Sequence, residues 1–131
     1  MAKRAAPLPT PKVQARPMKR RNSPAQKEAD LRVVLVTAPE KDAERIARIL
    51  LEERMIACAN LLPGVISLFW WEGKINREGE TLMLLKTPRS KISILLKRVK
   101  ELHGYAVPEF LALPIREANP DYLKWAENAT R

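Results

Sequence analysis

The stretch from Ala57 to Ile75, ACANLLPGVISLFWWEGKI, constrains the fold more than any other part of this chain. Val65 to Trp71 is rich in β-branched and aromatic residues and therefore predicts a strand. Pro63-Gly64 predicts a bend or bulge in front of it, because both residues disturb regular pairing. Glu72-Gly73-Lys74 interrupts the strand with charge and backbone freedom, and after a polar connection Glu80 to Lys86 predicts the partner strand. The chain must therefore contain a long, kinked hairpin.

A hairpin of this length is expected to extend beyond the core of so small a domain. Such a ribbon would expose apolar side chains and the hydrogen-bonding groups of its edges to water. We therefore expect the subunit to form an oligomer in which the aromatic residues of the hairpin are buried.

The remaining elements alternate around this hairpin. Their expected bounds are a strand over Leu31–Thr37, a helix from Pro39 through Arg54, a strand over Met55–Leu62 that leads into the hairpin, a helix from Thr87-Pro88 to His103-Gly104, a strand over Phe110–Ile115, and a short helix opened by Asn119-Pro120-Asp121. Pro39 and Pro88 suit a first helical position, and Thr87 suits an N-cap. Apolar residues three and four apart mark the two longer helices as amphipathic, so each docks one face on a sheet.

This order of elements indicates the fold class. It is β-α-β-β-α-β followed by a C-terminal helix, which is the α+β, ferredoxin-like split βαβ arrangement. In that arrangement an antiparallel sheet carries both helices on one face. The other face stays uncovered within the monomer, which again favours assembly.

The positive charge of the chain is concentrated at its N-terminus. The 131 residues carry a net charge of +9, and Met1–Asp30 contributes +6 of it. Prolines at five positions of this segment block helix and strand alike, so residues 1–30 are predicted to be a disordered, basic, proline-rich arm, followed by the folded domain 31–131. Such an arm can contact nucleic acid through Lys19-Arg20-Arg21, but it has no aromatic residue to stack on bases, so a solvated tail is the favoured interpretation.

Three absences bear on location. The single cysteine excludes an internal disulfide. No apolar run approaches the length of about 18 residues that a membrane span needs, and the basic N-terminus lacks the apolar region of a secretory signal. We therefore expect a cytoplasmic protein that does not contact membranes.

Several motifs, in order, resemble one known family. ACANLLPGVISLFWWEGKI (57–75), LKTPRS (85–90) and HGYAVPEFLALPI (103–115) closely resemble the CutA divalent-cation-tolerance proteins, and VLVTAPEKDAERIARILLEERMIACAN (34–60) and DYLKW (121–125) fit the same family. The resemblance implies a ferredoxin-like subunit in a compact homotrimer, similar in shape to PII-type signalling proteins, with the long hairpin pairing across subunits. It also implies a role in tolerance of copper and other divalent cations, with metal binding in some members.

Cys58 and His103 are the candidate metal ligands. The resemblance places both on family positions that have been connected with copper, and a thiolate with an imidazole suits Cu(II) or Zn²⁺. Val36 stands where some relatives have a second cysteine, and Gly104 replaces the usual proline after the histidine. One thiol and one imidazole fall short of three or four ligands, so the trimer would have to supply more. The competing interpretations are a buried thiol that packs as a small apolar group and a histidine that stabilises a helix C-terminus.

A cysteine and a histidine also raise the possibility of a nucleophile and its base. The sequence shows no orienting carboxylate and no nucleophile-elbow motif, so we expect no enzymatic activity. There is also no glycine-rich nucleotide-binding motif.

A second candidate site consists of six residues on family motif positions. They are Trp71, Lys74, Tyr105, Glu109, Tyr122 and Trp125. Aromatic walls with one lysine and one glutamate would suit a small polar ligand in a cleft between subunits. The alternative function is therefore a PII-like trimeric signalling protein that binds a small anion or metabolite there, and the structural alternative is interface packing with a salt bridge.

Overall fold

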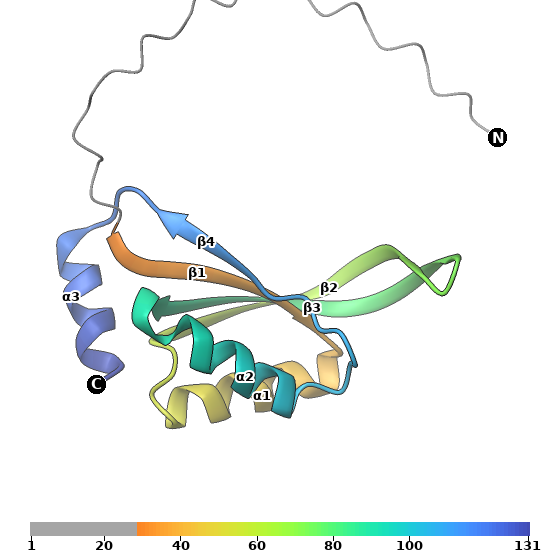
Figure 1. Ribbon diagram of the computed structural model, residues 1–131, viewed down its shortest axis with the longest axis horizontal. Coiled ribbons are helices and arrows are strands. Elements are labelled where there is room, and N and C mark those ends of the chain that lie inside the picture. The colour runs from red at the N-terminus through yellow and green to blue at the C-terminus, as the bar shows by residue number, and fades with distance from the viewer. Residues whose placement is uncertain (1–28) are drawn as a thin grey trace, which may run out of the picture.

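The computed structural model describes residues 29–131, so nearly all of the predicted arm lies outside the described residues. The elements are β1 (Ala29–Ala38), α1 (Glu40–Glu52), β2 (Cys58–Trp71), β3 (Lys74–Pro88), a 3-10 turn (Arg89–Lys91), α2 (Ile92–Leu102), β4 (Leu111–Ile115) and α3 (Pro120–Ala129). The sheet has the order β2-β3-β1-β4, and every neighbouring pair is antiparallel. Helices α1 and α2 cover one face, α3 lies at one end, and the β2–β3 hairpin projects from the other end (Figure 1). The predicted α+β, split βαβ fold is confirmed.

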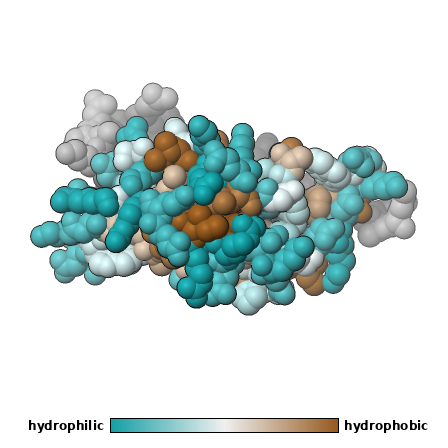
Figure 2. Space-filling model, turned by 90° about the horizontal axis from the view of Figure 1, so that it is seen from below, coloured by the Kyte–Doolittle hydropathy of each residue, from teal (hydrophilic) through white to brown (hydrophobic). Residues whose placement is uncertain are grey.

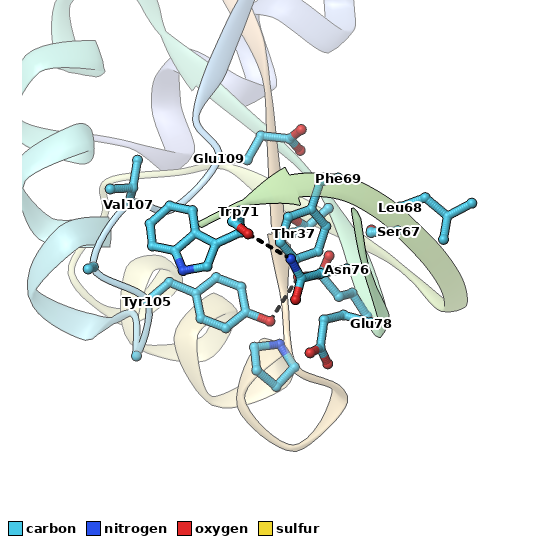
Figure 3. Close-up of a pocket in the computed structure, with 14 residues that line it drawn as sticks. Thr37, Ser67, Leu68, Phe69, Trp71, Asn76, Glu78, Tyr105, Val107 and Glu109 are labelled. Atoms are coloured by element: carbon cyan, nitrogen blue, oxygen red, sulfur yellow. Dashed lines mark hydrogen bonds between the residues drawn. The ribbon is translucent and has the colours of Figure 1, made fainter. Parts of the chain in front are cut away.

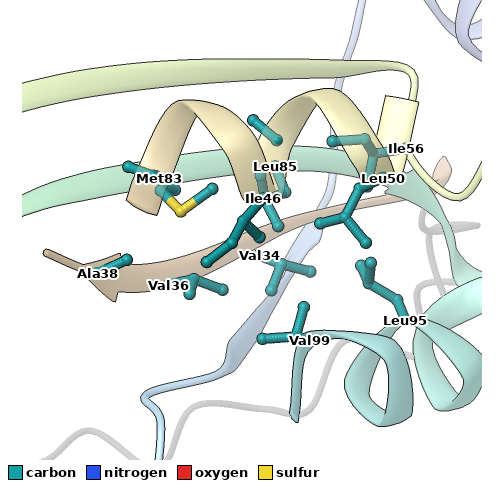
Figure 4. Close-up of a cluster of buried hydrophobic side chains, with 12 residues drawn as sticks. Val34, Val36, Ala38, Ile46, Leu50, Ile56, Met83, Leu85, Leu95 and Val99 are labelled. Atoms are coloured by element: carbon teal, nitrogen blue, oxygen red, sulfur yellow. The ribbon is translucent and has the colours of Figure 1, made fainter. Parts of the chain in front are cut away.

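The core lies between the sheet and the two longer helices. Val34, Val36 and Ala38 alternate along β1 and are fully buried, as expected for the covered face of a strand. Figure 4 shows them facing side chains from both helices and from β3. The helical partners are Ile46 and Leu50 of α1 and Leu95 and Val99 of α2. Each of these large side chains contributes roughly 1.5–3 kcal/mol by leaving water.

One strand of the hairpin, β3, is longer than the sequence predicted. β3 already begins at Lys74, so residues 75–79, which were expected to form a polar connection, pair with residues 66–70 of β2. Residues 75–79 are mostly polar, and for that reason the sequence predicted a connection there. Their pairing with the apolar strand segment 66–70 includes them in the ribbon. The other strand, β2, begins later than the sequence predicted, because residues 55–57 precede it.

A bulge at the base of the hairpin confirms the predicted kink. Leu62 pairs with Leu82 and Val65 pairs with Glu80, so β2 has one extra residue there. Gly64 adopts a φ of 75°, in the left-handed region that suits glycine. Its N–H donates a hydrogen bond of 2.9 Å to Oε1 of Glu40, which ties the bulge to the start of α1.

Two predicted helix starts need correction. Thr87 and Pro88 end β3 instead of opening a helix, and α2 begins only at Ile92. Thr87 Oγ1 donates a hydrogen bond of 2.7 Å to the Met55 carbonyl, so its hydroxyl is not available as a cap. Pro39 precedes α1 at the N-cap position. The predicted start of α3 is confirmed, because Asn119 Oδ1 accepts a hydrogen bond from the Asp121 N–H.

The two sides of the subunit differ in polarity. Seen from below, the side formed by α1 and α2 is largely hydrophilic around a confined apolar patch (Figure 2). Across the described residues, no helix combines the length and hydropathy needed to cross a membrane. On the projecting hairpin, by contrast, Ile66, Leu68, Trp70 and Ile75 are each more than half exposed.

Candidate functional site

The hairpin presents a polar and aromatic face at the point where it leaves the domain. Ser67 pairs with Glu78 and Phe69 with Asn76, so these side chains share one face by strand alternation. This face meets the end of β1 and the loop between α2 and β4 around a cavity of about 790 Å³ (Figure 3). That volume lies within the range of small-molecule sites. The cavity is therefore a candidate ligand site.

Tyr105 and Glu80 form a hydrogen-bonded pair in the lining of the cavity. Glu80 is only 3% exposed although it is a carboxylate, and its Oε2 accepts a hydrogen bond of 3.1 Å from the Tyr105 hydroxyl. Loss of water around the phenol, the bond to Glu80 and the negative charges of Glu78 and Asp42 together raise the pKa of Tyr105 to about 12. The phenol therefore remains a neutral donor at physiological pH.

His103 positions the loop that carries Tyr105. Its ring is buried at the end of α2, and Nε2 lies 2.7 Å from the Thr37 carbonyl. Because a carbonyl can only accept, Nε2 carries the hydrogen, and Nδ1 accepts the Tyr105 N–H at 3.1 Å. Both ring nitrogens are thus in use, and the imidazole lies against the Tyr105 ring at 4.6 Å between centroids.

Cys58 lies in a different environment at the first position of β2. Its thiol is partly buried, 3.9 Å from Lys86 Nζ and 3.9 Å from Asn60 Oδ1. Burial, together with the neighbouring Cys58, raises the pKa of Tyr122. The Tyr122 ring packs on Trp125 of the same helix at 5.4 Å. This group therefore joins the start of β2 to α3.

One subunit does not bring the two predicted metal ligands together. Cys58 pairs with Lys86, which pairs with Val33. His103 bonds to Thr37, four residues further along β1, which is about 13 Å along the strand direction alone. Residues 29–131 contain no group of three or more His, Cys, Asp or Glu arranged to hold a metal ion. Within a subunit these residues do not fit a bound metal.

The six predicted cleft residues divide between three places. Trp71, Tyr105 and Glu109 line the cavity. Lys74 lies at the hairpin turn, and Tyr122 and Trp125 lie on α3, where Tyr122 is the neighbour of Cys58.

Sequence reasoning missed Asn76, Glu78 and Glu80, which also line the cavity. Their spacing of two residues carried the signal, because in a strand such residues share one face. The prediction of a polar connection over residues 75–79 hid this spacing.

Comparison with known proteins identifies the family of this chain. Residues 32–129 match the family described as CutA1 divalent ion tolerance protein. The Divalent-cation tolerance protein CutA of Thermus thermophilus is 46% identical over 99 residues, covering 75% of this chain and 96% of that protein. Protein CutA 1, chloroplastic, of Oryza sativa is 45% identical over 100 residues, covering 76% of this chain and 56% of that protein. This chain thus spans little more than half the length of the rice relative.

A solved structure agrees with the sequence relatives. The PII-like protein CutA from Nostoc sp. PCC 7120 superimposes with a TM-score of 0.73 at 33% identity, covering 76% of this chain and 97% of that chain. The family resemblance and the PII-like subunit fold predicted from the sequence are therefore confirmed.

Proposed function

Because the chain belongs to the CutA1 divalent ion tolerance protein family, we propose that it acts in the cytoplasm as a homotrimer that binds divalent cations and catalyses no reaction. The observation that carries the assembly is apolar surface left uncovered by the single subunit. Leu111 and Leu113 of the edge strand β4 are about half exposed, and Trp70 of the hairpin is 73% exposed. Surface of this kind marks an interface. Light scattering on the full chain tests the trimer, and a monomer at micromolar concentration contradicts it.

The cation expected at the protein is Cu(II), with Cys58 as its soft ligand. The partly exposed thiol supports this assignment, and further donors would come from neighbouring subunits, because one subunit lacks a complete set. His103 would join only after losing one of its two ring hydrogen bonds. The test is a Cu(II) titration of the reduced protein by calorimetry. Cys58→Ser is expected to lower the affinity by roughly tenfold or more, and an affinity equal to that of the unmodified protein rules out this ligand.

A second function is favoured by the cavity itself. A PII-like trimer that binds a small ligand there, and signals to a partner, is supported by a volume of about 790 Å³ with aromatic walls and few polar groups. The test is to screen small molecules against the full chain by NMR. Binding that shifts the resonances of the Gly104–Glu109 loop supports this function, and the absence of any binding refutes it.

A further inference from the structure

We propose that helix α3 acts as a cover over Cys58 and that Lys91 and Arg54 hold this cover closed. The proposal concerns access to the thiol and holds whether or not Cys58 binds copper. Every contact that carries it joins residues of the same subunit, so it does not depend on surface that neighbouring subunits cover. Three features of α3 and its surroundings lead to it.

The first feature is a single face of α3 that reaches Cys58. Tyr122, Ala126 and Thr130 follow one another at intervals of four residues, so they share this face. Ala126 is fully buried in a cluster with Ala57, the residue directly before Cys58. One turn away, Tyr122 is the neighbour of Cys58, and at the other end Thr130 is only 3% exposed. The docked helix therefore lies over the start of β2.

The second feature is a pair of cations at the C-terminal end of α3. Lys91 Nζ donates a hydrogen bond of 2.8 Å to the Arg54 carbonyl and a second one to the Thr130 carbonyl. Arg54 Nη1 donates a hydrogen bond of 3.2 Å to the Ala129 carbonyl. The last carbonyls of a helix lack partners within it, and positive charge is favoured at that end. Lys91 and Arg54 thus fasten α3 to the loop between α1 and β2.

The third feature is the backbone of that loop. Arg54 adopts a φ of 60°, in the left-handed region that is unfavourable for a residue with a Cβ. Such a conformation persists where its surroundings hold it, and here the Arg54 carbonyl is held by Lys91. Loss of the Lys91 ammonium would therefore loosen α3 and, with it, the loop that leads to Cys58.

The test compares the full chain with Lys91→Met, which keeps the length of the side chain and removes its donors. Hydrogen exchange of α3, followed by mass spectrometry, is expected to accelerate roughly tenfold while α1 keeps its rate. Alkylation of Cys58, the single cysteine, by iodoacetamide under native conditions should accelerate by a similar factor, because the same opening exposes the thiol. Arg54→Met, which leaves both Lys91 hydrogen bonds in place, should accelerate both reactions less. It keeps the test valid if the first variant does not fold.

The control variant is Lys97→Met, which makes the same change on the exposed face of α2 and should alter neither rate. Unchanged exchange of α3 in Lys91→Met overturns the role of Lys91. Faster exchange of α3 with unchanged alkylation of Cys58 shows that the helix does not cover the thiol, and equal acceleration of α1 and α3 shows a general loss of stability. Both results overturn the proposal. None of these measurements uses copper, so they are independent of the metal site proposed above.

Discussion

The imidazole of His103 is held by both of its nitrogens, one on the Thr37 carbonyl and one on the Tyr105 N–H. We expect His103→Ala to lower the free energy of unfolding by roughly 2–3 kcal/mol, because it leaves both partners poorly satisfied. Urea denaturation at fixed protein concentration measures this loss. Lys97→Ala on the exposed face of α2 is the control and should change little. Stability unchanged in His103→Ala would mean that the imidazole is free for another role.

At Tyr105 the relevant measurement is stability at high pH. The folded pKa is about 12 and the ordinary value is 10, so the phenol keeps its proton in the folded state where the unfolded chain loses it. The protonated phenol therefore makes its full contribution to the stability of the fold below pH 10, and this contribution is lost as the pH rises toward 12. We therefore expect Tyr105→Phe to show a shallower loss of stability across this window than the unmodified protein. Identical slopes in urea denaturation at several pH values would contradict the raised pKa.

At the scale of the elements, the bulge in β2 depends on Gly64. Its φ of 75° is strained for any residue with a Cβ, although no atom other than those of residues 63–65 lies within 4 Å of where that Cβ would stand. Gly64→Ala should therefore cost roughly 1–2 kcal/mol through backbone strain alone. Gly79→Ala in the facing strand is the matched control, since Gly79 also has open space but no positive φ. Equal denaturation midpoints for the two variants would refute the strain argument.

The elements also show what the sequence can and cannot predict. The buried stripe of α1, with Ile46 and Leu50, was predictable because helical periodicity depends on neighbours in the chain. The start of α2 was not, because Thr87 is drawn into β3 by pairing with Arg32 and by its bond to Met55, which are contacts between distant residues. For the same reason, the sequence could point to Trp71, Tyr105 and Glu109, which line the cavity, without finding Glu78 and Glu80 beside them.

The charged residues of the cavity were also only partly predictable from the sequence. The sequence suggested one lysine and one glutamate around aromatic walls, since Lys74 and Glu109 both occupy family motif positions. The hairpin turn directs the ribbon so that Lys74 lies at the tip and Glu78 lines the cavity. Which charged residues converge is set by the register of β2 on β3, and the register became known only with the structure.

For the whole molecule, the distribution of apolar surface indicates which side would form the interface of the proposed trimer. The helical side is largely hydrophilic, and its apolar residues form a central patch and a few smaller spots (Figure 2). The hairpin carries Ile66, Leu68 and Ile75 at 55%, 68% and 65% exposure, beyond the reach of α1 and α2. Burying such a ribbon in water-excluding contacts favours association. The proposed trimer should therefore depend on the hairpin far more than on the helices.

A charge placed on each surface separates these contributions. Trp70 is 73% exposed on the hairpin and Ile94 is 50% exposed on α2. Because a buried unpaired ammonium is strongly disfavoured, Trp70→Lys should shift the light-scattering mass from trimer to monomer at micromolar concentration. Ile94→Lys, which introduces the same charge on the helical side, should leave the trimer intact. Since folding is coupled to association in a trimer, the Trp70→Lys protein should also melt at a lower temperature, and its Tm should no longer rise with protein concentration. A trimeric Trp70→Lys protein together with a monomeric Ile94→Lys protein would place the interface on the helices instead.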